Sequence, residues 1–370
     1  MQIVIEREAF LKSLAKVQGI VEKRNAMPIL SNTLLKAAGD SLHVVATDLE
    51  VTISDMCPVD VQKEGSITLS ARKLYDIIRE LPPGPVYLES GEDFRIEVKS
   101  ENDRFELMGL SPEDYPKIPQ VEEYKFINFP APLLLGMVNR TIYAAAGEDS
   151  RFSLNGIYTE KVEETGSFRM VTTDGHRLAL IDRQTDKLAE LELDKGVILP
   201  KKGMGEVAKI LEDHEGEVGV SLQEKMAAFS VDDTVVFMRL VDGKFPDYNR
   251  VIIEGCDKKA VIKCEELLKH LRRASTMVDE KARAVKFTFS NGKLSMESRN
   301  PNFGTSYSEL KIEYEGEQLV MAFNDRYFAD IMNVTKAEDL IVHLRDEQSP
   351  AVISIAEDPQ YTCVIMPMRI

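Results

Sequence analysis

Three segments of the chain repeat one pattern of apolar and polar positions, at residues 67–81, 197–211 and 319–333. Each combines a short apolar strand, a polar break and then apolar residues at the i, i+3, i+4 spacing of an amphipathic helix. A basic residue falls at the same place in every copy. The repetition predicts three copies of one structural unit. The positions that superpose are Leu69, Leu199 and Phe323; Leu74, Met204 and Phe328; Ile77, Val207 and Ile331; Ile78, Ala208 and Met332; and the basic Arg72, Lys202 and Arg326.

Further correspondences extend the repeat beyond these segments. A strand, a turn and a second strand recur in the first two units, with Asp48 over Asp174 at the turn. An apolar stripe with helical spacing opens each unit, and each unit ends at a large side chain followed by proline. The matching stretches are 44–53 with 170–180, 30–37 with 153–160, and the pairs Tyr115-Pro116, Phe245-Pro246 and Met366-Pro367.

These patterns predict an α+β fold. Short alternating runs between the helices are typical of half-buried antiparallel strands, and Asn291-Gly292 predicts a hairpin with a type I′ turn. Helices with one apolar face must pack on a sheet, so each domain is expected to place two helices on antiparallel sheet. The helices are predicted at 7–24, 71–80, 131–146, 200–212, 264–277 and 324–336, and the three repeated domains at 1–122, 123–252 and 253–370.

The composition narrows the class of protein. The 370 residues exceed what one ordinary core holds. No run approaches the roughly 20 apolar residues of a membrane span, and the N-terminus does not resemble a signal peptide. We therefore expect a cytoplasmic protein with no membrane partner. The scattered cysteines form no CxxC pair, so we expect no metal, no cofactor and no disulfide framework; they are Cys57, Cys256, Cys264 and Cys363.

The net charge of −16 argues against DNA binding when it is taken as a total, because phosphate attracts cations. The distribution of charge changes that conclusion. The six predicted helices contain 17 Lys and Arg against 10 Asp and Glu, which leaves −23 on the rest of the chain. If the repeat places all six helices on one surface, that surface contacts phosphates without reading bases. Since salt weakens such contacts steeply, retention on DNA would require a ring closed around the duplex.

Several motifs together carry a family resemblance: 171–179 (VTTDGHRLA), 240–248 (LVDGKFPDY), 364–370 (VIMPMRI), 47–50 (TDLE), 70–73 (SARK) and 6–8 (ERE). Over its whole length the chain resembles the bacterial DNA polymerase III beta subunit, the DNA sliding clamp family. The resemblance implies three clamp-type domains per protomer and a head-to-tail homodimer closed into a six-domain ring. It implies a processivity factor without catalysis or cofactor, associated with the nucleoid during replication. The implied partners are duplex DNA without sequence preference, the replicative DNA polymerase, the clamp loader, and repair and translesion polymerases and mismatch repair proteins with clamp-binding motifs.

The same resemblance implies a hydrophobic peptide-binding cleft between the second and third domains. Apolar residues would form its walls, and methionine adapts to varied ligands. Arg177 and the C-terminal backbone are expected to hydrogen-bond an extended peptide. Ala282 stands where relatives can carry an aromatic residue, which would make one pocket shallower. The implied cleft residues are Leu154, Thr173, Gly175, His176, Arg177, Leu178, Pro246, Arg250, Val251, Asn324, Tyr327, Val364, Met366, Pro367 and Met368.

Two further surfaces follow from the resemblance and from helix positions. At the dimer edge, some relatives carry an acidic cluster in the third domain, whereas residues 300–310 contain only Glu309. We therefore expect apolar contact to carry more of this interface. Matching positions imply DNA contacts at Arg24, Arg72, Lys73, Lys201 and Lys202, and helix position alone adds Arg140, Arg272 and Arg273. The dimer interface is expected to join Arg95, Arg104 and Phe105 to Thr276 and Met277.

Three alternatives compete with this prediction. Residues 202–208 imitate the GxGxxA dinucleotide fingerprint, but the other two copies have no glycines there and no parallel βαβ pattern surrounds the segment. Asp174 and His176 could suggest acid–base catalysis, although an aspartate beside Gly175 more simply fixes a turn. The third alternative is an acidic scaffold that binds peptides without encircling DNA.

Overall fold

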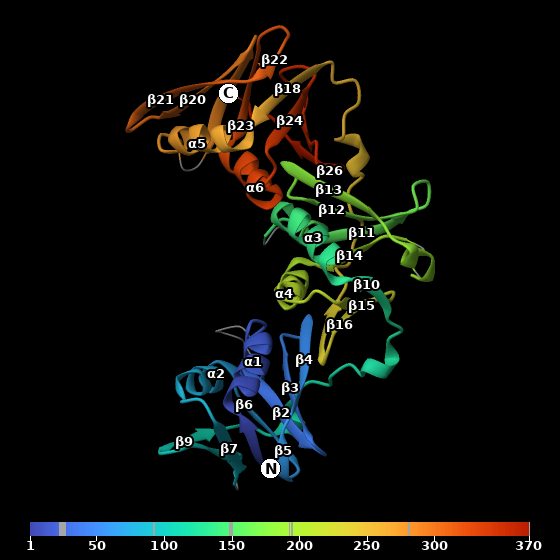
Figure 1. Ribbon diagram of the computed structural model, residues 1–370, viewed down its shortest axis with the longest axis vertical. Helices are drawn as coiled ribbons and strands as arrows, with labels where there is room; N and C mark the ends of the chain where they lie inside the picture. The colour runs from blue at the N-terminus through green and yellow to red at the C-terminus, as the bar shows by residue number, and fades with distance from the viewer. Residues whose placement is uncertain are drawn as a thin grey trace. The chain divides into compact units, whose positions relative to one another are not determined.

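The computed structural model describes residues 1–21, 27–91, 93–147, 151–191, 193, 195–279 and 282–369 (Figure 1). Backbone contacts divide the chain into two compact units. Unit 1 contains Met1–Leu135, Ala189–Leu193 and Lys202–Leu240, and unit 2 contains Gly136–Leu188, Asp194–Lys201 and Val241–Ile370. The domain limits at 122 and 252 stay a prediction. Across the described residues, no helix has the length and apolar character needed to cross a membrane.

All six predicted helices are present, and most keep the predicted start. They are α1 (Arg7–Gln18), α2 (Ala71–Glu80), α3 (Ala131–Thr141), α4 (Lys201–Leu211), α5 (Cys264–Ser275) and α6 (Asp325–Thr335). The prediction that the first helix continues through residues 19–21 is wrong, because α1 ends at Gln18. Gly19 follows it and lacks the Cβ that would stand 2.7 Å from the carboxylate of Glu206. The third helix is also shorter than predicted and continues as a 3-10 turn, η4 (Ile142–Ala144).

The repeated strand–helix pattern is confirmed. Strands β6 (Gly65–Ser70), β14 (Val197–Pro200) and β23 (Leu319–Asn324) run directly into α2, α4 and α6. Every superposed apolar position is buried except Ile77, which is half-buried. The shared apolar spacing therefore places one stripe of each helix in a core, as burial of an amphipathic face requires.

Unit 1 contains two antiparallel sheets. The first has the order β5-β1-β7-β8-β9 and the second β10-β15-β16-β17-β4-β3-β2-β6. Helices α1 and α2 pack against each other, and α1 also packs on β3 and β4. The strands are β1 (Gln2–Glu6), β2 (Asn32–Ala38), β3 (Ser41–Thr47), β4 (Val51–Pro58), β5 (Asp60–Lys63), β7 (Pro85–Ser90), β8 (Arg95–Ser100), β9 (Asp103–Met108), β10 (Ile127–Pro130), β15 (Glu217–Leu222), β16 (Met226–Val231) and β17 (Thr234–Arg239).

Unit 2 contains a nine-stranded and a four-stranded sheet, with the orders β14-β11-β12-β13-β26-β25-β24-β18-β22 and β21-β20-β19-β23. Helix α5 packs against β20 and β21 and against α6 (Figure 1). The remaining strands are β11 (Gly156–Val162), β12 (Ser167–Thr173), β13 (Arg177–Gln184), β18 (Lys258–Lys263), β19 (Ala284–Ser290), β20 (Lys293–Asn300), β21 (Gly304–Lys311), β22 (Glu313–Tyr314), β24 (Asp339–Leu344), β25 (Ala351–Ile355) and β26 (Asp358–Ile365).

The hairpin predicted at Asn291-Gly292 joins β19 to β20, but its predicted turn type is wrong. Ser290 pairs with Lys293 across a two-residue turn. A type I′ turn needs a positive φ at both central residues. Here Gly292 has φ 73, whereas Asn291 is not among the residues with positive φ.

Candidate functional site

A tight turn between β12 and β13 forms one rim of the candidate site. The Oδ1 atom of Asp174 accepts hydrogen bonds from the backbone N–H groups of His176 (2.9 Å) and Arg177 (3.0 Å). The hydroxyl of Thr173 donates to the backbone oxygen of Arg177, and Gly175 takes φ 88. The prediction that Asp174 fixes a turn beside Gly175 is confirmed.

The turn opens onto a cavity of about 190 Å³ in unit 2. We call it the first pocket. It lies over a cluster of buried apolar side chains from β12, β13 and β26. Antiparallel pairing of β13 with β26 sets Leu178 opposite Val364, so two of its apolar walls come from adjacent strands. The residues that line it are Arg151, Leu154, Thr173, Gly175, Arg177, Leu178, Pro246, Asp247, Tyr248, Val251, Val364 and Met366.

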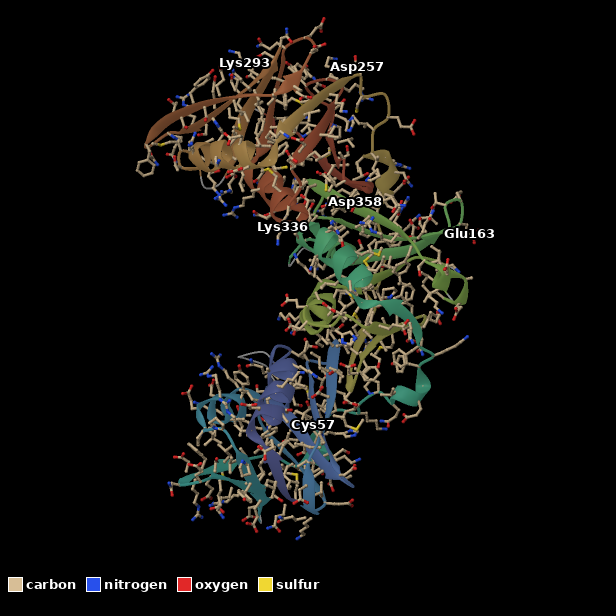
Figure 2. The ribbon with its side chains drawn as sticks, in the orientation of Figure 1. Cys57, Glu163, Asp257, Lys293, Lys336 and Asp358 are labelled. Carbon is tan, nitrogen blue, oxygen red and sulfur yellow. The ribbon has the colours of Figure 1, made fainter. Side chains whose placement is uncertain are left out.

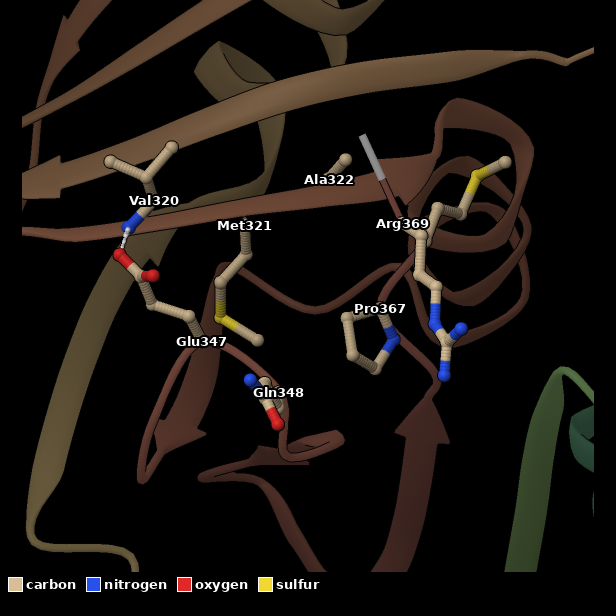
Figure 3. Close-up of a pocket in the computed structure, with 8 residues that line it drawn as sticks. Val320, Met321, Ala322, Glu347, Gln348, Pro367 and Arg369 are labelled. Atoms are coloured by element: carbon tan, nitrogen blue, oxygen red, sulfur yellow. Dashed lines mark hydrogen bonds between the residues drawn. The ribbon is translucent and has the colours of Figure 1, made fainter.

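The first pocket brings together nine of the fifteen predicted cleft residues. His176 and Arg250 are exposed outside its lining. The side chain of Asn324 caps helix α6 by accepting from the N–H of Arg326. Pro367 and Met368 line a different cavity of unit 2 (Figure 3). Tyr327 does not line the pocket either, but its ring lies 4.6 Å from the guanidinium of Arg177.

Arg177 fixes the wall of the first pocket. Its guanidinium donates to Asp174 (3.0 Å), to Asp330 on α6 (2.5 Å) and to the backbone oxygen of Tyr143 (2.7 Å). Burial alone would lower the pKa of Arg177, but the hydrogen bond to Asp330 and the nearby carboxylates raise it overall. The side chain is 13% exposed and lies over the rings of Tyr143 and Tyr327. These three donor atoms already have partners within the chain. Arg177 is therefore better suited to stabilising the pocket wall than to donating hydrogen bonds to a ligand.

Three residues that line the first pocket were not predicted from the sequence: Arg151, Asp247 and Tyr248. The last two lie within the quoted motif 240–248, which was the available signal. The hydroxyl of Tyr248 donates to the carboxylate of Glu160 and accepts from Arg169. Burial, and then the hydrogen bond to Glu160, raises the pKa of Tyr248 to about 12.

The network of Tyr248 extends away from the pocket. Arg169 makes a two-pronged ion pair with Asp182, with both N–O distances at 2.7 Å. Tyr158 also donates to Glu160 (3.1 Å), and its ring stacks on Phe245 at 4.8 Å between centroids. Since each buried polar group has a partner, this network holds the ring of Tyr248 in place as a pocket wall.

Cys363 lies behind the pocket wall on β26 and is buried. Tyr143 and Tyr361 share a hydrogen bond of 2.9 Å, and the Tyr143 hydroxyl lies 3.2 Å from the Cys363 sulfur. Burial raises the pKa of the Cys363 thiol to about 11. The thiol is therefore protonated near neutral pH, which favours a packing role over a reactive one. Among the described residues, no three His, Cys, Asp or Glu side chains gather as metal ligands.

The predicted DNA-facing residues fall into two groups. Arg72 and Lys73 on α2 and Arg272 and Arg273 on α5 are exposed, and none of the four makes an ion pair with a described residue. They are free to contact phosphate. Arg24 lies outside the described residues.

The other predicted DNA contacts have partners within the chain. Lys202 forms an ion pair with Asp48. Lys201 donates to the backbone oxygen of Ala145, and burial, followed by the charge of Arg177, lowers its pKa. Arg140 lies 3.7 Å from Asp358, which is labelled on β26 in Figure 2 and which also pairs with Arg183.

Comparison with known proteins gives three matches, one for each repeated unit of the chain. Models of one family, the DNA polymerase III beta subunit, match as the N-terminal domain at residues 1–119, the central domain at 129–247 and the C-terminal domain at 249–369. The chain belongs to this family. The beta sliding clamp of Pseudomonas aeruginosa is 35% identical over 373 residues, and that of Escherichia coli is 32% identical over 371 residues, with the full length of both chains covered in each case.

Solved structures of this clamp family share the fold. The sliding clamp of Bartonella birtlesii bound to griselimycin superposes with a TM-score of 0.95 at 35% identity, and covers 100% of each chain. The DNA polymerase III subunit beta of Pseudomonas aeruginosa gives a TM-score of 0.92 at 35% identity with the same coverage. The predicted α+β class with repeated clamp-type domains is confirmed.

In this member of the clamp family, Arg104 and Phe105 lie on β9 and Arg95 on the neighbouring β8, whereas Thr276 and Met277 follow α5, which packs against β21. Strand β9 is an edge of its sheet in unit 1, and β21 is an edge in unit 2. Arg95 pairs with Glu106 (2.9 Å) and Arg104 pairs with Glu97, so both arginines have partners on their own sheet. Phe105 and Met277 are half-buried and Thr276 is exposed. Large exposed apolar residues near these edges include Phe94, Met108, Phe303 and Tyr307.

Proposed function

We propose that the chain is a non-enzymatic DNA sliding clamp that encircles duplex DNA as a closed head-to-tail homodimer. In this role it tethers the replicative DNA polymerase and other proteins with clamp-binding motifs through the first pocket. The clamp loader, repair and translesion polymerases and mismatch repair proteins are the further proposed partners. The three domains are proposed at 1–122, 123–252 and 253–370, with the protein in the cytoplasm and at the nucleoid during replication.

The first pocket is the observation that carries the tethering role. Its apolar walls, Leu154, Leu178, Val251, Val364 and Met366, converge beside a few fixed polar groups, which is the usual make-up of a ligand site. The pocket combines rigid strand backbone with apolar side-chain walls. This combination favours an extended peptide that has large apolar side chains. The clamps of Pseudomonas aeruginosa and Bartonella birtlesii have been solved bound to griselimycin. We propose that griselimycin binds this chain in the first pocket.

The exposed arginines and lysine of α2 and α5 support the DNA-binding role. Arg72, Lys73, Arg272 and Arg273 keep their charge free of ion pairs with described residues in a chain whose net charge is −16. Side chains of this kind contact phosphates without base specificity. A ring keeps the protein on DNA at salt concentrations where such contacts alone would release it.

Retention on closed DNA tests the ring. With a clamp loader and ATP, the protein should stay on nicked circular DNA at moderate salt and leave after the circle is cut. Arg72→Glu should reduce loading, and Lys117→Glu, the same charge change at an exposed residue elsewhere, should not. Sedimentation should give a dimer near twice 41.6 kDa. Equal retention on circular and linear DNA, or peptide binding by a strict monomer, would instead favour the acidic scaffold that does not encircle DNA.

A further inference from the structure

The first helix of each repeat carries a basic residue at the same position. Lys16, Arg140 and Arg273 are each the tenth residue of their helices, α1, α3 and α5. The fourth and eighth residues of all three helices are buried apolar side chains, so the tenth residues project from equivalent faces. These buried residues are Phe10 and Leu14, Leu134 and Val138, and Leu267 and Leu271. A residue that recurs in three repeats is expected to make a comparable contact in each.

In the first repeat, the basic tenth residue closes a junction between two repeats, meaning the pair of strands through which the sheet of one repeat continues into the next. Strand β4 of the first repeat pairs with β17 of the second, with Asp55 opposite Thr234. Lys16 donates to the carboxylate of Asp55 and to the hydroxyl of Thr234, both at 2.7 Å, and Thr234 donates to Asp55 (2.6 Å). Asp55 and Thr234 are buried, so this polar contact stabilises the junction from within.

The second repeat joins the third in a similar way, through the pairing of β13 with β26. The guanidinium of Arg140 lies 3.7 Å from the carboxylate of Asp358, which Arg183 of β13 also contacts. Thr234 and Asp358 occupy equivalent places, because each is the first residue of its strand after a two-residue hairpin turn. In both junctions, therefore, the basic tenth residue contacts the first residue of the strand that comes from the next repeat.

The third repeat has the same parts without a junction among the described residues. By its order after the first helix, β21 corresponds to β4 and β13, and by its order after the second helix, β9 corresponds to β17 and β26. Both β21 and β9 are edge strands of their sheets. Arg273 is exposed on α5, and Asp103 is the exposed first residue of β9 after a two-residue turn. Neither side chain forms an ion pair with a described residue.

Other charges at these two edges already have partners. Glu309 is the only acidic residue in 300–310, and it pairs with Lys293 (3.0 Å) on the adjacent strand. Arg95 pairs with Glu106 (2.9 Å) on its own sheet. The opposite charges of Arg273 and Asp103 therefore remain available to each other.

We propose that Arg273 forms an ion pair with Asp103 of a second copy of the chain, where β21 of one copy pairs with β9 of the other. The proposal rests on the proposed function, because the contact requires the head-to-tail dimer. Arg273 then contacts protein and not phosphate, whereas the three other residues proposed to contact DNA from α2 and α5 keep that role. The junction between protomers thus repeats the contact that closes the two junctions within the chain.

Charge reversal tests the contact. Arg273→Glu places two carboxylates together, so the dissociation constant of the dimer should rise at least about tenfold, since like charges that meet across an interface are unfavourable and a closed ring contains the contact twice. Asp103→Arg alone should weaken the dimer by a similar factor. The double variant restores opposite charges, and its dissociation constant should return to within about threefold of the wild type. Sedimentation equilibrium at about 0.1 M salt, where screening is incomplete, measures all four proteins.

The adjacent arginine provides the matched control. Arg272 is exposed on the same helix, but its counterparts Ala15 and Asn139 are not basic. Arg272→Glu should leave the dissociation constant of the dimer unchanged and reduce loading onto DNA. An unchanged dimer in Arg273→Glu, or a double variant that dissociates more readily than either single one, would overturn the ion pair while the wild type still loaded as a clamp. A wild-type protein that stays monomeric would remove the proposed ring, and the ion pair with it.

Discussion

One turn occurs twice in the chain, and only its second copy forms part of the first pocket. In the first copy, Oδ1 of Asp48 accepts from the N–H groups of Glu50 (2.9 Å) and Val51 (2.7 Å), as Oδ1 of Asp174 does from His176 and Arg177. Both turns place a residue with positive φ after the aspartate. The backbone conformation of the two turns is therefore the same. Only the surrounding side chains explain why the second turn, and not the first, forms part of the first pocket.

Two pairs of counterpart residues illustrate this difference in side chains. Thr52 of the first copy hydrogen-bonds to Thr47 (2.8 Å), whereas its counterpart Leu178 forms a wall of the first pocket. Tyr115 ends the first unit with its hydroxyl donating to the backbone oxygen of Val45 (3.2 Å). Its counterpart Phe245 has no hydroxyl and stacks on Tyr158 instead. In the first copy, polar side chains hydrogen-bond within the unit. In the second copy, apolar side chains form a surface that a ligand can cover.

Removal of the C-terminal segment should disrupt the first pocket, so that the turn at Asp174, like the turn at Asp48, no longer forms part of a ligand pocket. Deletion of Met366–Ile370 takes away the Met366 wall and the hydrogen bond from its N–H to the oxygen of His176 (2.9 Å). We expect about a 100-fold loss of griselimycin affinity by calorimetry, because loss of a central anchor costs at least about 2–3 kcal/mol. The melting temperature and the dimer should be unchanged. An affinity within threefold of wild type would show that the pocket lies elsewhere.

A single exchange between the copies tests which side chain matters. Leu178→Thr installs the first-copy residue in the first pocket, and we expect about a tenfold loss of griselimycin affinity, since burial of a leucine side chain contributes about 1.5–3 kcal/mol. The matched exchange, Thr52→Leu, should leave affinity unchanged. If both variants bind griselimycin equally well, the side chain of Leu178 does not distinguish the two turns.

Features that depend on residues close together in the sequence could be predicted from it, and those that depend on distant residues could not. The repeated strand–helix segments were predictable, because apolar residues at helical spacing must be buried along one face of the helix. The turn at Asp174 was predictable because aspartate next to glycine favours a turn. The internal partners of Lys201 and Lys202 were not predictable, since Ala145 and Asp48 lie 56 and 154 residues away. Arg177 was assigned to the ligand from the family resemblance. Its contact with Asp330, which lies 153 residues further along the chain, could not be predicted from the sequence.

The backbone of the turns offers a smaller test. Leu49 takes φ 78 and Gly175 takes φ 88, in the region that costs an L-residue about 1–2 kcal/mol. Gly175→Ala should therefore lower the free energy of unfolding by about 1–2 kcal/mol. Leu49→Gly should raise it by about 0.5 kcal/mol, because the relief of strain exceeds the added chain entropy. Urea unfolding measures both, and a change of the same sign in the two variants would contradict the shared geometry.

The smallest expected effect concerns the polar network beneath the first pocket. Burial raises the pKa of Tyr248 to about 12, against about 10 for an unfolded chain. The folded protein therefore favours the neutral phenol, and this contribution to stability is complete below pH 10 and is lost between pH 10 and 12. In Tyr248→Phe the free energy of unfolding should fall less steeply over that interval than in wild type. The slope does not vanish, because Tyr158 also has a pKa raised to about 12. Urea unfolding at pH 9, 10.5 and 11.5 measures the slope, and parallel curves for the two proteins would mean that the Tyr248 hydroxyl does not hold the pocket wall.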